Sequence, residues 1–137
     1  MPGMEAASSY AELRRQEAAS PKRLYAIDAV TTPASPVSDV GVLTAVAVAA
    51  VRSGGGHVLD ASHVIFPNGA ITLVLILAES HLSIHTWPEE SLIAIDLFSC
   101  GAIDGERVLT ELTSALHLAA ASVTEFHRGS LPGLRGA

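Results

Sequence analysis

The chain has 137 residues, of which 49% are apolar and only 4% aromatic, and its formal net charge is −6. This length suits a single domain, and the acidic balance argues against nucleic acid or an anionic membrane as the main partner. The one cysteine, Cys100, excludes an internal disulfide, and the longest apolar runs are too short to span a bilayer, so we expect a cytoplasmic protein.

The apolar spacing along the chain predicts one folded domain over residues 21–129. Residues 1–20 are rich in Ala, Ser and Glu and predict a flexible extension, and residues 130–137 a loose tail. The expected elements are a strand over Lys22–Thr31, a helix from Ser38 or Asp39 to about Arg52, strands over His57–Phe66, Ile71–Glu79, Ser80–Thr86 and Leu92–Phe98, a helix over Asp104–Ala119, and a strand over Ser122–His127.

This order of elements provides too few helices to cover both faces of a sheet. We therefore expect an α+β fold, a two-layer sandwich with one mostly antiparallel sheet and two helices on one face. The other face, which we expect to be rich in Val, Leu and Ile, needs a second covering. A second copy of the chain is the simplest covering for this face, so we predict a homodimer in which two sheets pair face to face.

The most informative segment runs from Leu77 to Glu89 and reads L-A-E-S-H-L-S-I-H-T-W-P-E. It places Ser80 directly after Glu79, with the imidazole of His85 five positions later. A hydroxyl beside a peptide carbonyl, together with a group that moves protons, can cut the chain at its own backbone. Ser80 would attack the carbonyl of Glu79, and His85 is the expected base, because imidazole titrates near neutral pH.

His81 and His85 also fit the H-x-x-x-H spacing with which a helix presents two metal ligands. The alternation of Leu82 and Ile84 with polar neighbours predicts a strand instead, and Pro88 argues against a continuing helix. We therefore expect no metal at this position.

The segment from Ala78 to Glu89, together with I-D-L-F-S-C-G at residues 95–101, resembles the self-processing site of the prokaryotic S-adenosylmethionine decarboxylase proenzymes. Their sequences read E-S-H-x-S/T-I-H-T-W-P-E and then I-D-x-F-x-C-G. The resemblance implies cleavage between Glu79 and Ser80, and conversion of Ser80 into a pyruvoyl cofactor. Such a carbonyl forms a Schiff base with a substrate amine and takes up electrons as the carboxylate leaves. The implied product is decarboxylated S-adenosylmethionine, the aminopropyl donor in spermidine biosynthesis.

The resemblance also implies roles for three other residues. Thr72, eight positions before Ser80, would assist the acyl shift. Cys100 would protonate the substrate carbanion, and an ordinary thiol does carry its proton at neutral pH. Glu89 would accept hydrogen bonds from the ribose hydroxyls of the small-molecule substrate. Simple packing of Cys100 and a solvated role for Glu89 are the alternatives.

The substrate depends on an aromatic residue before the cleavage site. Residues 62–69 parallel the family's F-H-x-F-x-P-x-G, but alignment on Pro67 and Gly69 puts the adenine-stacking aromatic at Ile65, one position before Phe66. One residue more than usual separates Gly69 from Ser80, and a β-bulge there would bring Phe66 into place. Decarboxylation of arginine or ornithine on the same scaffold is the first alternative to S-adenosylmethionine. An unprocessed, non-catalytic partner subunit is the second.

Overall fold

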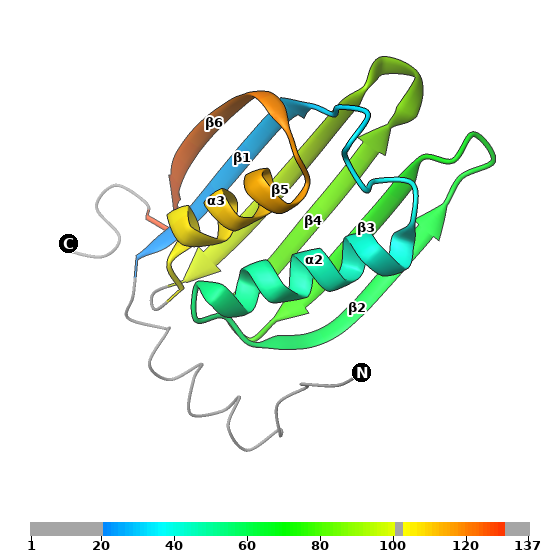
Figure 1. The fold of residues 1–137 in the computed structure, drawn as a ribbon. Coiled ribbons are helices and arrows are strands. Elements are labelled where there is room, and N and C mark those ends of the chain that lie inside the picture. Colours follow the sequence, from blue (N-terminus) through cyan, green and yellow to red (C-terminus); the bar gives the residue numbers. More distant parts are fainter. Residues whose placement is uncertain (1–20, 101–102, 131–137) are drawn as a thin grey trace.

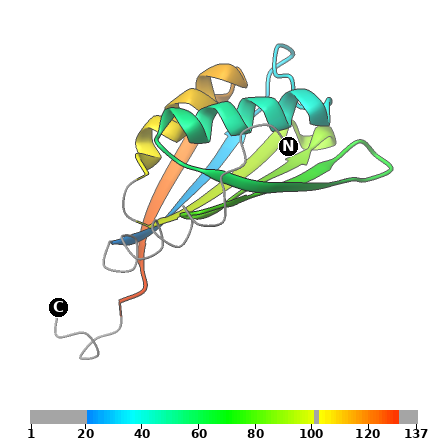
Figure 2. The ribbon, with the colours of Figure 1, turned by 90° about the horizontal axis from the view of Figure 1, so that it is seen from below.

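The computed structural model describes residues 21–100 and 103–130. Within them the strands form one six-stranded sheet in the order β2-β3-β4-β5-β1-β6, and each neighbouring pair is antiparallel. Both helices pack on the same face of this sheet (Figures 1 and 2). The elements are β1 (Lys22–Val30), α2 (Val40–Ser53), β2 (Val58–Ile65), β3 (Ile71–Leu77), β4 (Ser80–Trp87), the 3₁₀ turn η1 (Pro88–Glu90), β5 (Leu92–Cys100), α3 (Gly105–Ala115) and β6 (Ala119–Arg128).

The predicted two-layer α+β architecture is therefore confirmed. The pairing of two sheets in a dimer stays a prediction. The predicted extension, residues 1–20, and all of the predicted tail except Ser130 lie outside the described residues.

Helix α2 begins and ends where the sequence predicts. The carboxylate of Asp39 accepts hydrogen bonds from the backbone N–H groups of Gly41 at 2.9 Å and Val42 at 3.2 Å, which caps the first turn. The helix ends at Ser53, before the predicted Gly54-Gly55-Gly56 stop. Its apolar stripe lies in the core through Leu43, Ala47, Ala50 and Val51.

Helix α3 is shorter than the sequence predicts. The apolar spacing continues to Ala119, but the helix ends at Ala115, and His117 takes a left-handed φ of 50°. The carbonyl of His117 accepts hydrogen bonds from the hydroxyls of Thr32 at 2.9 Å and Ser35 at 3.2 Å. These contacts from the loop before α2 hold the reversal, so β6 begins at Ala119 instead of Ser122.

The two faces of the sheet differ in composition because side chains alternate along each strand. The face under the helices carries the aliphatic core, for example Leu82 and Ile84 of β4 and Ile95 of β5, all fully buried. The register shows what the open face carries. The row across its middle is Ser62, Val74, Ser83, Asp96, Ala26 and Thr124.

The expectation of an open face rich in Val, Leu and Ile is therefore wrong. The helix-facing positions take most of the aliphatic residues, and β4 gives the open side His81, Ser83 and His85. Exposed apolar side chains on this open face are scattered among the polar ones. They include Val64, Ile76, Trp87 and Phe126.

Candidate active site

The Glu79–Ser80 bond lies at the tightest turn of the sheet. Leu77 and Ser80 are paired across β3 and β4, so only Ala78 and Glu79 connect the two strands. Ser80 has a φ of 146°, a backbone conformation that a residue with a side chain rarely adopts. Such a conformation costs about 1–3 kcal/mol and persists only where neighbouring contacts impose it. The predicted cleavage point is therefore a strained peptide.

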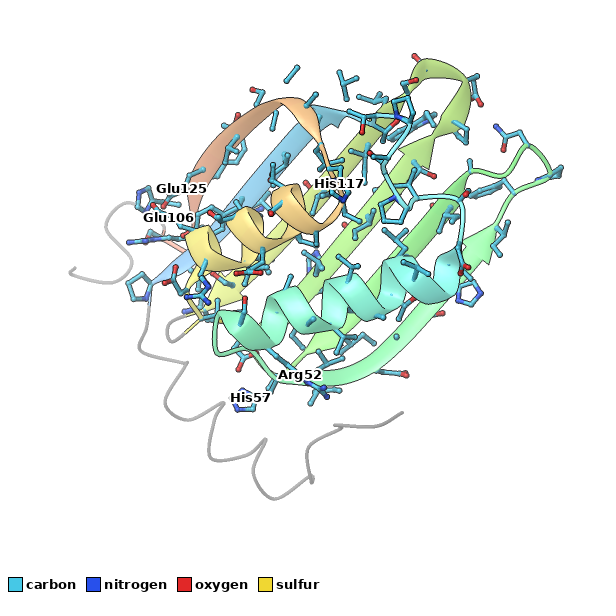
Figure 3. The ribbon with its side chains drawn as sticks, in the orientation of Figure 1. Arg52, His57, Glu106, His117 and Glu125 are labelled. Atoms are coloured by element: carbon cyan, nitrogen blue, oxygen red, sulfur yellow. The ribbon has the colours of Figure 1, made fainter. Side chains whose placement is uncertain are left out.

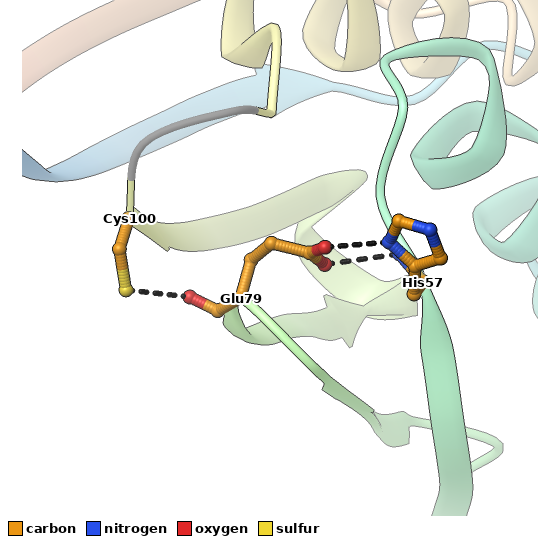
Figure 4. Close-up of polar contacts among 3 residues, drawn as sticks. All are labelled: His57, Glu79 and Cys100. Atoms are coloured by element: carbon orange, nitrogen blue, oxygen red, sulfur yellow. Dashed lines mark hydrogen bonds and ion pairs between the residues drawn. The ribbon is translucent and has the colours of Figure 1, made fainter. Parts of the chain in front are cut away.

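The carbonyl oxygen of Glu79 is held by two donors from one residue. The backbone N–H of Cys100 donates to it at 3.2 Å, and the Cys100 Sγ donates at 3.0 Å (Figure 4). Cys100 is 4% exposed and ends β5, which runs two residues further than predicted. Two donors converging on one carbonyl are the arrangement that stabilises negative charge on its oxygen.

The side chain of Glu79 is held from the opposite side. Its carboxylate is 1% exposed and accepts two hydrogen bonds from His57, one from the backbone N–H at 2.9 Å and one from Nδ1 at 2.7 Å (Figure 4). The His57 carbonyl also accepts the N–H of Ala78 at 2.9 Å. His57 follows α2, which ends at Ser53, by four residues; it is labelled in Figure 3.

Gly56 explains how the chain reaches this position. A Cβ on Gly56 would come within 2.5 Å of a Val51 methyl group and 2.7 Å of the Ile103 side chain. The absence of a side chain lets the segment pass close to α2 and places His57 against the turn.

A second group of predicted residues lies at the other end of β4. Thr72 and His85 are paired across β3 and β4, and Thr72 Oγ1 is 3.3 Å from His85 Nδ1. The His85 ring is also 6.1 Å from the Trp87 ring, centroid to centroid. The hydroxyl of Thr72 therefore orients the ring of His85 and, within one protomer, does not reach Ser80.

A cavity of about 350 Å³ opens beside this second group. Phe66 and Trp87 supply aromatic walls, and Thr72 and His85 supply polar atoms. Asn68 also lines it and donates to the Glu89 carboxylate at 3.0 Å, which places Glu89 at the cavity's edge.

The β-bulge expected between Gly69 and Ser80 is absent from the described register. Pairing runs without a shift from Thr72 opposite His85 to Leu77 opposite Ser80, and the bulge lies on β2, between Val58 and Asp60. Phe66 lies in the turn after β2, where its N–H donates to the carbonyl of Ala70 at 2.8 Å.

The predicted site residues thus fall into two groups within one protomer. Ser80 and His85 stand five positions apart on one strand, which corresponds to about 16 Å at a rise of about 3.3 Å per residue. Proton transfer needs heavy atoms within about 2.6–3.2 Å, or one water between them. Glu79, Ser80 and Cys100 form one group, and Phe66, Thr72, His85 and Glu89 form the other.

His81 and His85 lie on a strand, as predicted, and not on a helix. The His81 ring stacks on Phe98 at 6.0 Å between centroids. Among the described residues no three His, Cys, Asp or Glu side chains are grouped so that they could hold a metal ion. In the same part of the chain, neither helix has the length and apolar character needed to cross a membrane.

A larger groove, of about 630 Å³, lies between α3 and β6. His117 is its one titratable lining residue, and none of the predicted site residues borders it. The smaller cavity beside His85 is therefore the better candidate for a substrate.

Sequence reasoning missed three residues of this region: His57, Asn68 and Trp87. Trp87 belongs to the quoted motif, and Asn68 to the predicted turn, but neither spacing indicates a contact. His57 precedes β2, which pairs with β3, the strand that leads to Glu79. Local sequence does not indicate that β2 pairs with β3, so it does not indicate the contact between His57 and Glu79.

The chain is similar in sequence to proteins of a known family. The S-adenosylmethionine decarboxylase family model matches residues 23–129. The S-adenosylmethionine decarboxylase proenzyme of Thermotoga maritima is 42% identical over 82 residues, which is 59% of this chain and 62% of the relative. That of Symbiobacterium thermophilum is 39% identical over 95 residues, 69% of this chain and 72% of the relative. The match thus spans about three fifths of the Thermotoga relative's length.

One solved structure shares the fold. The adenosylmethionine decarboxylase of Aquifex aeolicus superposes with a TM-score of 0.69 at 22% identity, covering 83% of this chain and 95% of that one. The family model matches well over half of this chain, and the two relatives are both named as decarboxylase proenzymes. The chain belongs to the S-adenosylmethionine decarboxylase family.

Proposed function

We propose that this protein is a self-processing decarboxylase that uses a pyruvoyl group made from Ser80, and that its substrate is S-adenosylmethionine. One observation carries the proposal: the strained Glu79–Ser80 peptide has its carbonyl oxygen between the N–H and the thiol of Cys100. This arrangement suits attack by a neighbouring hydroxyl, and the names of the relatives, which are proenzymes, support it.

The proposed processing begins when the Ser80 hydroxyl oxygen adds to the carbonyl carbon of Glu79. The C–N bond then breaks, the hydroxyl proton ends on the freed nitrogen, and an ester joins the two residues. Removal of the Ser80 α-proton and breakage of the Cβ–O bond release Glu79 as a new carboxylate end. The Ser80 remnant tautomerises to an imine, and addition of water expels ammonia and leaves a pyruvoyl group at residue 80.

Cys100 has two tasks in this scheme. During processing its N–H and thiol stabilise the oxyanion that develops on Glu79. During turnover the thiol delivers a proton to the α-carbon of the substrate after carbon dioxide has left. The pyruvoyl carbonyl supplies the electron sink for that loss.

The cavity beside His85 supports an adenosyl substrate. Phe66 and Trp87 both line it, so two aromatic faces are available for a planar base. Glu89, which accepts a hydrogen bond from Asn68 at the edge of this cavity, would accept hydrogen bonds from ribose hydroxyls. Arginine and ornithine could place a cation over these aromatic faces, but neither carries a planar purine for the two rings or ribose hydroxyls for Glu89. The geometry therefore favours S-adenosylmethionine over the two basic amino acids.

A homodimer would join the two groups of site residues. In this dimer the open faces of the two sheets would be paired, and a two-fold axis between them would cross β4 near Ser83. The axis would reverse the strand direction, so that the Ser80 end of one protomer lies over the partner's His85. The exposed Val64, Ile76 and Phe126 on that face would be covered in the same contact. Each site would then take Ser80 and Cys100 from one chain and the aromatic cavity from the other.

Complementation tests this shared site. Ser80→Ala and His85→Ala chains, each distinguished by a small mass tag, are co-expressed and isolated as a mixed dimer. We expect the His85→Ala chain to be cleaved in the mixed dimer and to stay uncleaved when expressed alone. A His85→Ala chain that stays uncleaved in an isolated mixed dimer would contradict the shared site. A fully active monomer in light scattering would do the same.

Two measurements test the function itself. Denaturing mass spectrometry should find fragments 1–79 and 80–137, the second lacking a free amino terminus. The cleaved protein should release labelled carbon dioxide from carboxyl-labelled S-adenosylmethionine, and not from labelled arginine or ornithine. Intact protein with an unmodified serine after long incubation would refute the proposal and would favour a non-catalytic partner subunit.

A further inference from the structure

We propose that His57 is a positioning residue for the self-cleavage at Glu79–Ser80, acting through the buried carboxylate of Glu79. The inference rests on the proposed function and adds a residue that the motif does not contain. His57 lies 22 positions before Glu79 and comes from the segment that leads into β2.

The Glu79 carboxylate is almost fully buried, at 1% exposure. Within the described part of the chain it accepts two hydrogen bonds, both from His57: the backbone N–H at 2.9 Å and Nδ1 at 2.7 Å. An ionised carboxylate only accepts hydrogen bonds, so Nδ1 carries the hydrogen in this contact. The backbone bond would persist whatever residue stood at 57, whereas the ring bond is specific to the side chain.

These contacts fix the residue whose carbonyl is attacked. The carbonyl oxygen of Glu79 is bound by Cys100 from the end of β5, and the side chain is bound by His57 from the segment just before β2. One residue is therefore held at two ends by two separate segments of the chain, as Figure 4 shows. A strained backbone such as that of Ser80 persists only when its neighbours are fixed in this way.

The ring donor also matters more as the reaction proceeds. Addition of the Ser80 hydroxyl puts negative charge on the Glu79 carbonyl oxygen, and the elimination step leaves a second carboxylate on Glu79. An interaction that strengthens as charge develops accelerates a reaction, whereas one of constant strength does not. The Nδ1–H of His57 partly neutralises the negative charge of the Glu79 side chain, which lies beside this developing charge.

A matched pair of substitutions isolates the ring donor. His57→Asn places an amide N–H close to the position of Nδ1, and His57→Leu has nearly the same shape without a donor. The ring is 34% exposed, so either side chain can be accommodated. His63→Ala is the control, because His63 is an exposed histidine on the adjoining strand β2.

The full-length chains are made by cell-free synthesis, and the conversion to two fragments is followed by denaturing mass spectrometry. We expect His57→Leu to lower the first-order cleavage constant by about tenfold or more, as loss of one hydrogen bond to a charged group would. His57→Asn should stay within about threefold of the wild type on the same scale. His63→Ala should cleave at the wild-type rate.

A His57→Leu chain that cleaves at the wild-type rate would overturn the inference, as would a His57→Asn chain slowed as much as His57→Leu. A second comparison does not depend on how well His57→Leu folds by itself. In a Glu79→Gln background the carboxylate charge is gone, so His57→Leu should change cleavage by about twofold or less. A tenfold effect persisting there would mean that His57 acts on folding alone. If the wild type itself does not cleave, it is the proposed function that has failed.

Discussion

Replacing Cys100 separates the formation of the cofactor from its use. Cys100→Ala removes the thiol donor at 3.0 Å from the Glu79 carbonyl and keeps the backbone donor at 3.2 Å. Loss of a strong oxyanion donor costs about 10²–10³ in rate, and a thiol is a weaker donor than an amide. We therefore expect Cys100→Ala to cleave about tenfold more slowly, a change of about 1.4 kcal/mol in the barrier.

The serine variant sharpens this expectation. Cys100→Ser retains a hydroxyl donor, so its cleavage should be close to that of the wild type. In both variants the rate of decarboxylation per pyruvoyl group should fall by about 10² or more, because neither supplies an acidic thiol to protonate the substrate.

The assay follows fragments by denaturing mass spectrometry and labelled carbon dioxide per cleaved chain. If Cys100→Ala kept full decarboxylase activity per pyruvoyl group, the thiol would not be the acid that protonates the substrate. If it also cleaved at the wild-type rate, the oxyanion argument would be wrong.

Three further substitutions test single steps. Ser80→Ala should remain one uncleaved chain in mass spectrometry, because no hydroxyl is left to attack, and any cleavage at residue 79 would contradict the mechanism. His85→Ala should stall at the ester, so added hydroxylamine should split the chain between residues 79 and 80; failure to split would remove His85 from the elimination step. Phe66→Ala should leave cleavage unchanged and raise the KM for S-adenosylmethionine about fivefold or more, because a stacked aromatic contributes about 1 kcal/mol beyond its buried area; an unchanged KM would place the adenine elsewhere.

Local sequence was sufficient for most elements of the fold. The two ends of α2 lie at Asp39 and at the three glycines after Ser53, because capping and chain reversal are local properties. The end of α3 was not predictable in this way. No Gly or Pro marks it, and the apolar spacing runs on, but Thr32 and Ser35, more than 80 positions away, bind the carbonyl of His117. A contact between distant segments there overrides the local pattern.

The same distinction applies to the candidate site. The motif indicates which groups lie together, since Ser80, Glu79 and Cys100 do meet at one turn. It did not indicate His57, because that contact depends on which strand pairs with β3. It also suggested by nearness in sequence that Ser80 and His85 act together, although a strand carries them about 16 Å apart.

Because Ser80 and His85 are about 16 Å apart along β4, they do not meet within one chain. In a loop, a base five positions from a serine can fold back and reach it within the same chain. On β4 it cannot, because each residue advances the strand by about 3.3 Å. In the proposed homodimer, a second β4 running in the opposite direction over the open face would reverse the order, so the Ser80 end of one strand would meet the His85 end of the other. The spacing of Ser80 and His85 would then set the position of the two-fold axis near Ser83. Substitutions that shift this contact along β4 should impair cleavage even where every residue of the motif is intact.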